Sequence, residues 1–506
     1  MSAINGINGS HAGPTLEWKV GLCKKDDGKV VYLTAEKIQN LINASATAMK
    51  AKQLWTVEHD DTEADVVYLR SPQGCYLAGD RHGNVTCSVQ DKSEADTKFV
   101  LEYSGTGNWA FRNKAHGLYF GGEGEYLHCN GKTASPSEWW TVRLAVHPQV
   151  NLRSLNRKRY AHLDEEANEI HVDESIPWGQ DALITLEFQD GKYGVKTCNN
   201  MYLSRTGELV NQLNKDSLYT LELKSGQHAG MALKDANGKY LTAVGKTGTM
   251  QSRASSIGKD EIFTLEDSHP QVYLTAHNGK KVSIKQGVDI SANQTELEDT
   301  EIFQLEYDSG TKWRFRTAQD KYWSVAAANG IQREGSRRDT AGVFDIEWLE
   351  DGCIALKATN GCYVNAAQNG SLYATSKSID TKEKFELTII NRPLLVLRCE
   401  HGFLGLTSSN NAKLQCNRAG YDVFTMEPSP SGKGDYYIKG PNGQFWCVGG
   451  DRSVVASSAQ PKPFRLILKG QSRFAIRADS GQFLKGEQNG LTEAKVDESA
   501  ATLWEF

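Results

Sequence analysis

Phe303-Gln304-Leu305-Glu306 and Phe344-Asp345-Ile346-Glu347 are two clear copies of the short pattern that decides the fold of this chain. A large apolar residue and an aliphatic residue enclose one spacer, and a glutamate follows. Such alternation is typical of a β-strand with one buried face. We therefore predict a chain of twelve β repeats, because with its weaker copies the apolar anchor recurs at spacings of 35 to 44 residues, at Trp55, Phe99, Trp140, Ile184, Tyr219, Phe263, Phe303, Phe344, Phe385, Phe424, Phe464 and Trp504.

A second marker lies upstream of most anchors, as in Gly238-Lys239-Tyr240-Leu241 and Gly361-Cys362-Tyr363-Val364. The glycine supplies the positive φ that a tight turn needs, and the aromatic-aliphatic pair begins the next strand. Each unit therefore reads as turn, strand, turn, strand. Helical periodicity is weak throughout the chain.

A longer period groups the repeats in threes. His147-Pro148-Gln149-Val150 recurs as His269-Pro270-Gln271-Val272, and Asn391-Arg392-Pro393-Leu394 takes the same place again, so the prolines lie 122 and 123 residues apart. Three units of about 40 residues that close into one barrel are the arrangement of a β-trefoil, which hides its sheet edges. A propeller is the rival fold for this period. Paired six-bladed rings would have one major joint, near residue 270, so the joints at 148 and 393 argue against them. The chain also has no Trp-Asp dipeptide.

The predicted fold is therefore all-β, with four tandem β-trefoil domains. We place them at residues 16–147, 148–269, 270–390 and 391–506. Residues 1–15 are rich in Gly, Asn and Ser, and we expect them to form a disordered N-terminal tail.

Composition excludes several classes of function. Lys+Arg number 57 and Asp+Glu 62 in 506 residues, so the net charge of −5 gives no general attraction to nucleic acid. No apolar run approaches the ~20 residues of a membrane helix, and the start lacks the apolar core of a signal peptide, so we expect a cytoplasmic protein without membrane insertion. The ten cysteines form no C-x-x-C pair, which favours reduced, mostly buried thiols over disulfides or zinc.

Motifs for catalysis are absent from the sequence. Gly245-Lys246-Thr247 ends like a phosphate-binding loop, but Tyr240 replaces its first glycine. The twelve histidines show no metal-ligand spacing. We therefore predict no enzymatic activity, no metal and no cofactor. Sugar binding is an alternative, although Gln53-Leu54-Trp55 is the one anchor copy with the Gln-x-Trp pattern of ricin-type lectins. A cytosolic multivalent trefoil lectin or a lipid-headgroup binder stays open.

Local clusters of basic residues are the remaining feature. They comprise Arg153, Arg157, Lys158 and Arg159 after the first joint, Lys50 and Lys52 in the first domain, and Arg333, Arg337 and Arg338 in the third. A solvated face is the ordinary interpretation of any one such cluster. Several clusters on different rigid domains also suit separate docking surfaces for an acidic polymer, with attraction that weakens as salt rises.

Longer stretches carry a resemblance to a known family. They include Tyr32-Leu33-Thr34-Ala35-Glu36, Lys52-Gln53-Leu54-Trp55-Thr56, Arg157-Lys158-Arg159-Tyr160-Ala161-His162-Leu163, Glu400-His401-Gly402-Phe403 and Leu503-Trp504-Glu505-Phe506. On these residues the chain resembles the fascins, filament cross-linkers built from four β-trefoils in tandem. The likeness covers nearly the whole chain after residue 15, and the departures make it look like an invertebrate-like member.

The resemblance implies a monomer that binds F-actin through at least two faces. It would tie parallel filaments into tight bundles of the cytoskeleton, such as those of filopodia and other cell projections. One implied face joins the first and fourth domains and matches Lys50, Lys52, Arg392, Arg398, Glu400 and His401. A second implied face matches Arg157, Lys158, Arg159 and Lys259, and Lys280 matches an arginine of the third domain.

The chain also departs from the family pattern. Ala51 replaces a lysine between Lys50 and Lys52, Thr407 and Ser408 replace a basic pair, and Ala366 and Ala367 replace two lysines. Lys413 and Arg333 are candidate compensations. The serine that protein kinase C phosphorylates in the family aligns with Ala48. Either Thr47 or Ser45 accepts the phosphate instead, which would place about −2 charge near the two lysines, or the chain lacks this switch.

Overall fold

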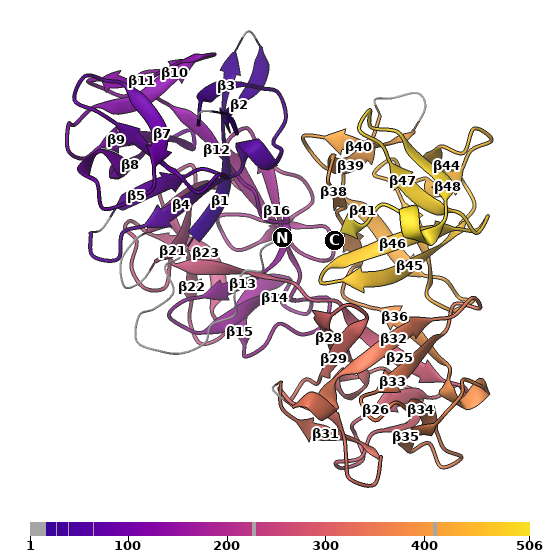
Figure 1. The fold of residues 1–506 in the computed structure, drawn as a ribbon. Helices are drawn as coiled ribbons and strands as arrows, with labels where there is room; N and C mark the ends of the chain where they lie inside the picture. Colours follow the sequence, from indigo (N-terminus) through magenta and orange to yellow (C-terminus); the bar gives the residue numbers. More distant parts are fainter. Residues whose placement is uncertain are drawn as a thin grey trace.

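The computed structural model describes residues 17–26, 28–38, 40–63, 65–224, 229–337, 339–407 and 412–506. The predicted N-terminal tail, residues 1–15, lies outside this part of the chain. Regular structure in the described segments consists of β-strands and six short 3-10 helices, without an α-helix. No helix in these segments is long and apolar enough to cross a membrane. The strands form four separate sheets, one after another along the chain (Figure 1).

The first sheet shows how each sheet closes. Its strand β1 pairs with β4, β4 with β5, β5 with β8, β8 with β9, β9 with β12, and β12 with β1. These six strands make a closed barrel, and three hairpins, β2–β3, β6–β7 and β10–β11, cover one end. A six-stranded barrel with three hairpins is a β-trefoil. The twelve strands are β1 (Glu17–Asp26), β2 (Lys29–Ala35), β3 (Ile42–Ala46), β4 (Trp55–His59), β5 (Val66–Arg70), β6 (Tyr76–Gly79), β7 (Val85–Val89), β8 (Phe99–Tyr103), β9 (Asn108–Asn113), β10 (Tyr119–Glu123), β11 (Tyr126–Gly131) and β12 (Trp140–Leu144).

The second sheet repeats this order, with an isolated bridge between Tyr193 and Tyr219 completing its barrel. Its strands are β13 (Gln149–Ser154), β14 (Arg159–Asp164), β15 (Glu169–Glu174), β16 (Ile184–Gln189), β17 (Lys192–Lys196), β18 (Tyr202–Leu203), β19 (Leu209–Val210), β20 (Thr220–Lys224), β21 (Gly230–Lys234), β22 (Tyr240–Val244), β23 (Thr249–Ala254) and β24 (Phe263–Asp267).

The third sheet closes through β25, β28, β29, β32, β33 and β36. Its strands are β25 (Gln271–Ala276), β26 (Lys281–Ser283), β27 (Ser291–Gln294), β28 (Phe303–Ser309), β29 (Lys312–Arg316), β30 (Tyr322–Val325), β31 (Ile331–Gly335), β32 (Phe344–Trp348), β33 (Ile354–Ala358), β34 (Tyr363–Ala366), β35 (Leu372–Ser376) and β36 (Phe385–Ile389).

In the fourth sheet the first barrel strand is split into β37 and β38, which pair with β41 and β49. The strands are β37 (Leu394–Leu395), β38 (Arg398–Cys399), β39 (Gly402–Leu406), β40 (Leu414–Arg418), β41 (Phe424–Pro428), β42 (Asp435–Lys439), β43 (Phe445–Val448), β44 (Val454–Ser458), β45 (Pro463–Gly470), β46 (Arg473–Ala478), β47 (Phe483–Gly486), β48 (Thr492–Val496) and β49 (Trp504–Glu505). The 3-10 helices are η1 (Ala51–Gln53), η2 (Ala95–Thr97), η3 (Asp299–Glu301), η4 (Thr340–Gly342), η5 (Thr381–Glu383) and η6 (Glu498–Ala500). The prediction of an all-β chain of four β-trefoils is confirmed.

The repeated sequence pattern has a physical explanation in this fold. All twelve anchors are at most 1% exposed, and ten of them are the first residue of a barrel strand. The glutamates that follow accept hydrogen bonds from the tyrosines of the second marker. Six such pairs, at 2.8 to 3.1 Å, are Glu58–Tyr76, Glu102–Tyr119, Glu187–Tyr202, Glu222–Tyr240, Glu306–Tyr322 and Glu347–Tyr363. Each glutamate therefore fixes the strand that the next turn begins.

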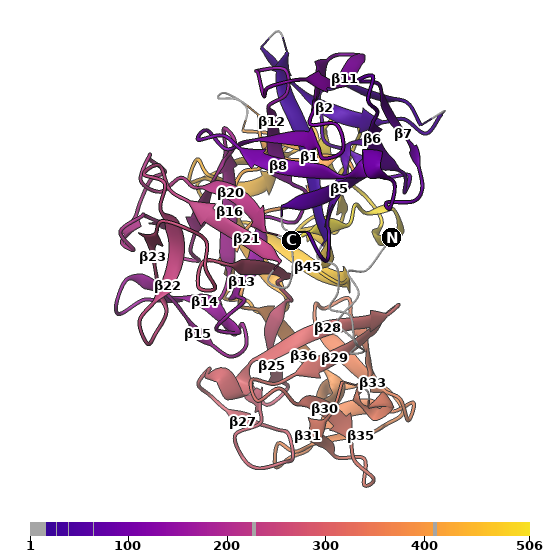
Figure 2. The ribbon, with the colours of Figure 1, turned by 90° about the vertical axis from the view of Figure 1, so that its left-hand side faces the viewer.

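The four domains form two lobes. One continuous hydrophobic cluster runs through the first and second domains, and another runs through the third and fourth. Figures 1 and 2 show how the four domains are arranged. In the first lobe Trp109 Nε1 donates to the Leu221 carbonyl at 3.1 Å, and the Leu144 amide donates to Tyr193 Oη at 2.9 Å. Tyr436 Oη accepts from the Ile389 amide at 2.7 Å in the second lobe.

Buried side chains also join the two lobes. Gln149 is 2% exposed, donates from Nε2 to the Leu394 carbonyl at 2.8 Å, and accepts from the Val396 amide at 2.9 Å. Gln271 follows the next joint and makes an equivalent pair with the Pro177 carbonyl and the Gly179 amide at 2.8 and 2.7 Å. The recurring Pro-Gln of the sequence therefore marks two hydrogen-bonded connections between the lobes.

Candidate functional site

The first-domain lysines lie on a loop that a buried glutamine holds. Gln53 is 5% exposed, its Nε2 donates to Thr34 Oγ1 at 2.9 Å, and its Oε1 accepts from the Lys50 amide at 3.0 Å. Lys50 and Ala51 are exposed. Lys52 is half-exposed and pairs with Glu36 at 2.5 Å, an interaction that lowers the pKa of Glu36. Lys50 is therefore the more available cation of this loop.

Both candidate phosphorylation sites precede the same loop. Ser45 lies in β3 and Thr47 follows it, and both are exposed. Ser45 Oγ donates to Asn43 Oδ1 at 2.7 Å. Ala48 is half-buried. A phosphate on Thr47 would stand three residues before Lys50.

The fourth-domain residues lie on the turn between β38 and β39. Glu400 is 75% exposed, and its carboxylate lies 3.6 Å from His401 Nε2. Gly402 has a φ of +144°, and a Cβ there would lie 2.8 Å from the Arg418 carbonyl, so this turn requires glycine. The turn therefore presents Glu400 to solvent on a constrained backbone.

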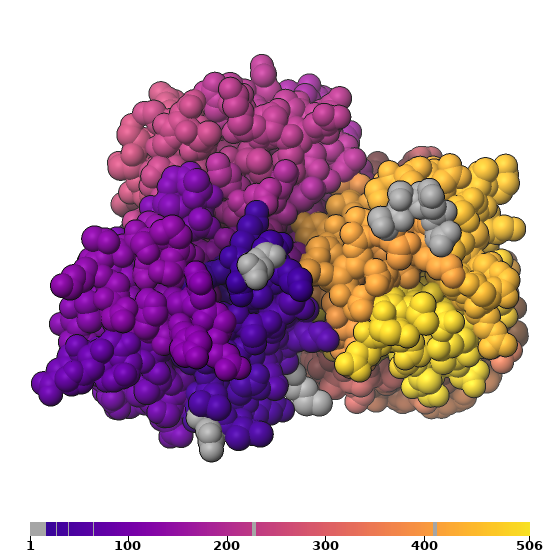
Figure 3. Space-filling view, turned by 90° about the horizontal axis from the view of Figure 1, so that it is seen from above, coloured from indigo at the N-terminus to yellow at the C-terminus, as the bar shows by residue number. Residues whose placement is uncertain are grey.

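Arg398 connects this turn to the first domain. Its Nη2 pairs with Glu505 at 2.5 Å, and its Nη1 donates to the Ala145 carbonyl at 3.1 Å. Partial burial would raise the pKa of the half-buried Glu505, but Arg398 and His147 outweigh it and lower that pKa. The first and fourth domains consequently lie side by side, as Figure 3 shows from above.

One expectation from the sequence is corrected here. Arg392 is 1% exposed, so its guanidinium cannot contact a partner in this conformation. It donates to Ser268 Oγ and to the Ser268 and Asn391 carbonyls at 2.8 to 3.1 Å and lies 5.2 Å from the Phe506 ring, and burial lowers its pKa to about 9. Arg392 therefore holds a domain joint. Ala366, which replaces a family lysine, is fully buried in the third-domain core.

The basic candidates of the second domain fall into two groups, exposed side chains and one that is engaged in hydrogen bonds within the domain. Lys158, Arg159 and Lys259 are exposed, and each lacks an ion-pair partner among the residues that the structure describes. Arg157 instead donates to the Ala243, Gly245 and Lys246 carbonyls and holds the β22–β23 turn, the stretch that resembled a phosphate loop.

Asn156 Nδ2 donates to Asp260 Oδ1 at 3.0 Å, and the Leu155 amide donates to the Ile262 carbonyl at 3.0 Å. These bonds bring the Lys158–Arg159 turn beside the segment that carries Lys259.

The other sequence candidates are less available. Lys280 is half-buried in the β25–β26 turn, and no hydrogen bond or ion pair among the described residues links it to either set. Lys413 pairs with Asp451 at 2.7 Å, and Arg333 donates to the Ile284 carbonyl, so neither compensates as a free cation. Thr407 is half-buried, as is Ala367. Ser408 and Arg338 lie outside the described residues.

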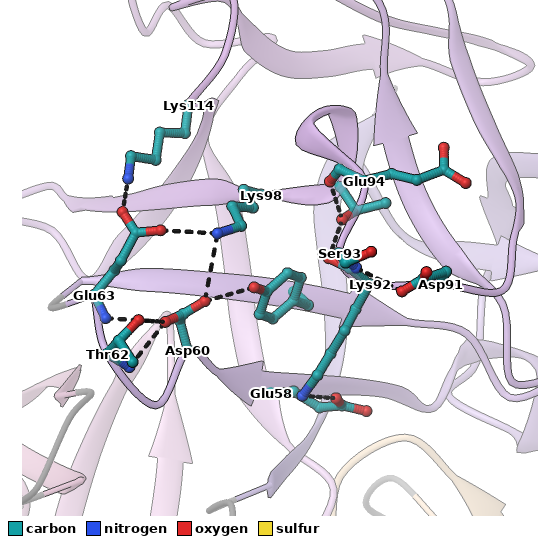
Figure 4. A network of polar contacts seen from close by, with 12 residues as sticks. Glu58, Asp60, Thr62, Glu63, Asp91, Lys92, Ser93, Glu94, Lys98 and Lys114 are labelled. Carbon is teal, nitrogen blue, oxygen red and sulfur yellow. Dashed lines mark hydrogen bonds and ion pairs between the residues drawn. The ribbon is translucent and has the colours of Figure 1, made fainter.

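A polar network on the first domain was not predicted from the sequence (Figure 4). Asp60 accepts from the Thr62 hydroxyl and amide and from Tyr68 Oη, at 2.5 to 2.9 Å. Its burial would raise the pKa of Asp60, but these hydrogen bonds outweigh it and lower that pKa. Neighbouring lysines are neutralised here, because Lys92 pairs with Glu58, and Lys98 and Lys114 pair with Glu63. The Asp60-x-Thr62 spacing of an Asx turn is the signal that could have found it.

Thiols and metal-binding groups complete the inventory. Seven of the ten cysteines are buried, and Cys353, Cys399 and Cys447 are half-buried. The described segments contain no group of three or more His, Cys, Asp or Glu side chains placed to hold a metal ion.

Comparison with known proteins gives matches over the whole chain. A family model described as "Fascin domain" matches residues 29–142, 150–265, 277–387 and 400–506, and an FRG1-like domain model matches residues 214–324. The chain is 40% identical to Fascin-2 of Bos taurus over 503 residues, 99% of each chain. It is 38% identical to Fascin of Strongylocentrotus purpuratus over 511 residues, 97% of this chain and 99% of that one. Fascin-3 of Mus musculus is 27% identical over 94% of this chain and 95% of its own.

Proposed function

The chain belongs to the fascin family, and from this premise we propose that it binds F-actin through at least two faces of a rigid monomer and ties the filaments into tight parallel bundles. Membership implies actin bundling, an association with the actin cytoskeleton, and a structural rather than an enzymatic role. Residence in filopodia, phosphorylation by protein kinase C at Thr47 or Ser45, and the domain limits 16–147, 148–269, 270–390 and 391–506 are parts of the same proposal.

The first face comprises Lys50, Lys52, Arg398, Glu400 and His401. The Arg398 contacts with Ala145 and Glu505 support it, because they fix the fourth-domain turn relative to the first domain. Exposed ion pairs contribute about 0–1 kcal/mol each, so binding needs several of them on one fixed surface. Arg392 acts on this face by holding the joint.

The second face comprises Lys158, Arg159 and Lys259. Its three exposed cations come from two segments that the Asn156–Asp260 hydrogen bond holds together. The face belongs to the second domain, so it is separate in sequence and in sheet from the first face. Two such surfaces on one chain can hold two filaments at once.

The observation that carries the proposal is the connection between the lobes. Gln149 and Gln271 make paired, buried hydrogen bonds across them, so the two faces sit on one body. A bundle with fixed filament spacing requires a cross-linker whose domains do not flex. Buried, fully paired amides provide that stiffness without a covalent link.

Charge reversal on each face tests the assignment. Lys50→Glu with Lys52→Glu should abolish actin pelleting at low speed while co-pelleting at high speed persists, because one face remains. The matched control is Lys132→Glu with Lys215→Glu, which changes the same charge at two exposed lysines outside both faces. Normal bundling by the Lys50/Lys52 variant would refute the first face. Salt-insensitive sugar binding, or binding to lipid headgroups, without filament binding would favour the alternative.

A further inference from the structure

Two cysteines of the fourth domain are placed together by neighbouring strands. Cys399 ends β38 and pairs with Gly402 of β39, and β39 pairs in turn with β40, which carries Cys416. Cys399 Sγ donates to the Cys416 carbonyl at 3.5 Å, and Cys416 Sγ donates to the Glu487 and Leu491 carbonyls at 3.4 and 3.7 Å. Cys399 is half-buried, whereas Cys416 is fully buried. Small oxidants therefore reach the pair from the Cys399 side.

The interaction between the two thiols distinguishes this pair chemically. It lowers the pKa of Cys416 to about 7 and, together with burial, raises the pKa of Cys399. Burial raises the pKa of Cys23, Cys87 and Cys353 to about 11 and that of Cys129 and Cys198 to about 12. A thiolate is the reactive form of cysteine, so the pair holds one reactive sulfur near neutral pH.

We propose that Cys399 and Cys416 form a hydroperoxide-sensitive dithiol that closes to an intramolecular disulfide. The thiolate of the pair attacks one peroxide oxygen, the O–O bond breaks, and a sulfenic acid forms as hydroxide leaves and takes up a proton. The other sulfur then attacks the sulfenic sulfur, the S–S bond forms, and water leaves. Two thiols lose two electrons, and hydrogen peroxide is reduced to two waters.

Formation of the disulfide would change the conformation of the turn that follows Cys399. The His401 amide donates to Cys399 Sγ at 3.5 Å, and the Cys399 thiol proton that bonds the Cys416 carbonyl is lost on oxidation. The turn cannot relax freely, because Gly402 lies against the Arg418 backbone. Oxidation therefore shifts Glu400 and His401. The consequence for actin rests on the proposed function, and we expect weaker bundling by the oxidised protein.

The first domain supplies a matched internal control. Cys87 Sγ donates to the Cys75 carbonyl at 3.7 Å, a similar cross-strand contact. Both cysteines of this control pair are buried, at 3% and 6% exposure, and the pKa of Cys87 is raised. Proximity alone would oxidise both pairs, whereas the proposed chemistry oxidises the fourth-domain pair first.

The experiment treats the full-length protein with hydrogen peroxide, alkylates the remaining thiols and maps the peptides by mass spectrometry. We expect a Cys399–Cys416 cross-linked peptide, a loss of about 2 Da for the two hydrogens, reversal by dithiothreitol, and unlinked Cys75 and Cys87. Equal linkage of both pairs, or no linkage at a dose that oxidises methionine, would overturn the proposal. Cys399→Ser should abolish the cross-link.

Low-speed pelleting with actin, before and after oxidation, separately measures the effect of the disulfide on bundling. Weaker bundling by the oxidised wild type, with no response of Cys399→Ser, supports the link to the first face. Unchanged bundling by protein that carries the disulfide overturns that link. If the reduced protein does not bundle actin, the proposed function fails, and the peptide map still decides whether the dithiol forms.

Discussion

Replacing Gln149 by alanine tests the stiffness on which bundling depends. The substitution leaves the Leu394 carbonyl and the Val396 amide without their partner, in residues that are 3% and 0% exposed. An unpaired buried group costs about 1–3 kcal/mol, so the loss is about 2–6 kcal/mol. If water enters the vacated space and bonds these two groups, the loss of stability lies at the lower end of this range. The hydrogen bond between His147 Nε2 and the Val396 carbonyl, at 3.2 Å, remains.

Amide hydrogen exchange at Val396 measures this loss directly. If the connection opens locally, about 2 kcal/mol speeds exchange roughly 30-fold. Asn151→Ala is the matched control, because Asn151 is also buried and donates to the Ala182 carbonyl at 2.9 Å, but within one domain. It should leave exchange at Val396 unchanged. Unaltered protection at Val396 in the Gln149 variant, together with bundles of unaltered filament spacing, would refute the reasoning.

Three further predictions concern acid, the repeat and the second face. Burial lowers the pKa of His147 to about 4. The neutral imidazole therefore contributes fully to the free energy of unfolding above pH ~6.5, and this contribution is lost as pH falls towards 4, with about 2 kcal/mol lost at pH 5. His147→Gln should lose less stability between pH 7.5 and pH 5 in urea unfolding. Tyr76→Phe leaves Glu58 short of a hydrogen bond and should cost about 1–3 kcal/mol in thermal unfolding, whereas Tyr126→Phe, at an 85% exposed residue, should change little. Lys158→Glu with Arg159→Glu should abolish low-speed pelleting and spare high-speed co-pelleting; intact bundles would remove these residues from the second face.

Repetition made the fold predictable. Twelve anchors at a nearly constant spacing define the units, and the three recurring joints group them, because each barrel needs three equivalent copies to close. The glutamate of the pattern was recognised in the sequence, but its hydrogen bond to a tyrosine was not predicted. Its tyrosine partner lies 15 to 18 positions further on, where the second marker begins a strand, so the pairing appears only once the turn is folded.

The site was less predictable, because sequence position does not determine exposure. Arg392 follows a joint and looks like a surface cation, yet it is enclosed where Ser268 of the second domain meets Phe506 of the fourth. Arg157 stands beside Lys158 and Arg159 in a basic run, but its guanidinium binds three carbonyls about 90 residues further along the chain. The role of Gln149 depends on partners some 245 residues away. Such long-range contacts leave no local signal.

Paired low-speed and high-speed sedimentation of the purified chain with actin filaments, over a range of salt concentrations, tests the central claim most directly. The proposed function predicts that actin pellets at low speed and that the effect weakens as salt rises, because exposed cations on two faces carry the binding. Co-pelleting at high speed alone would mean a single working face, and no pelleting at either speed would contradict actin cross-linking altogether.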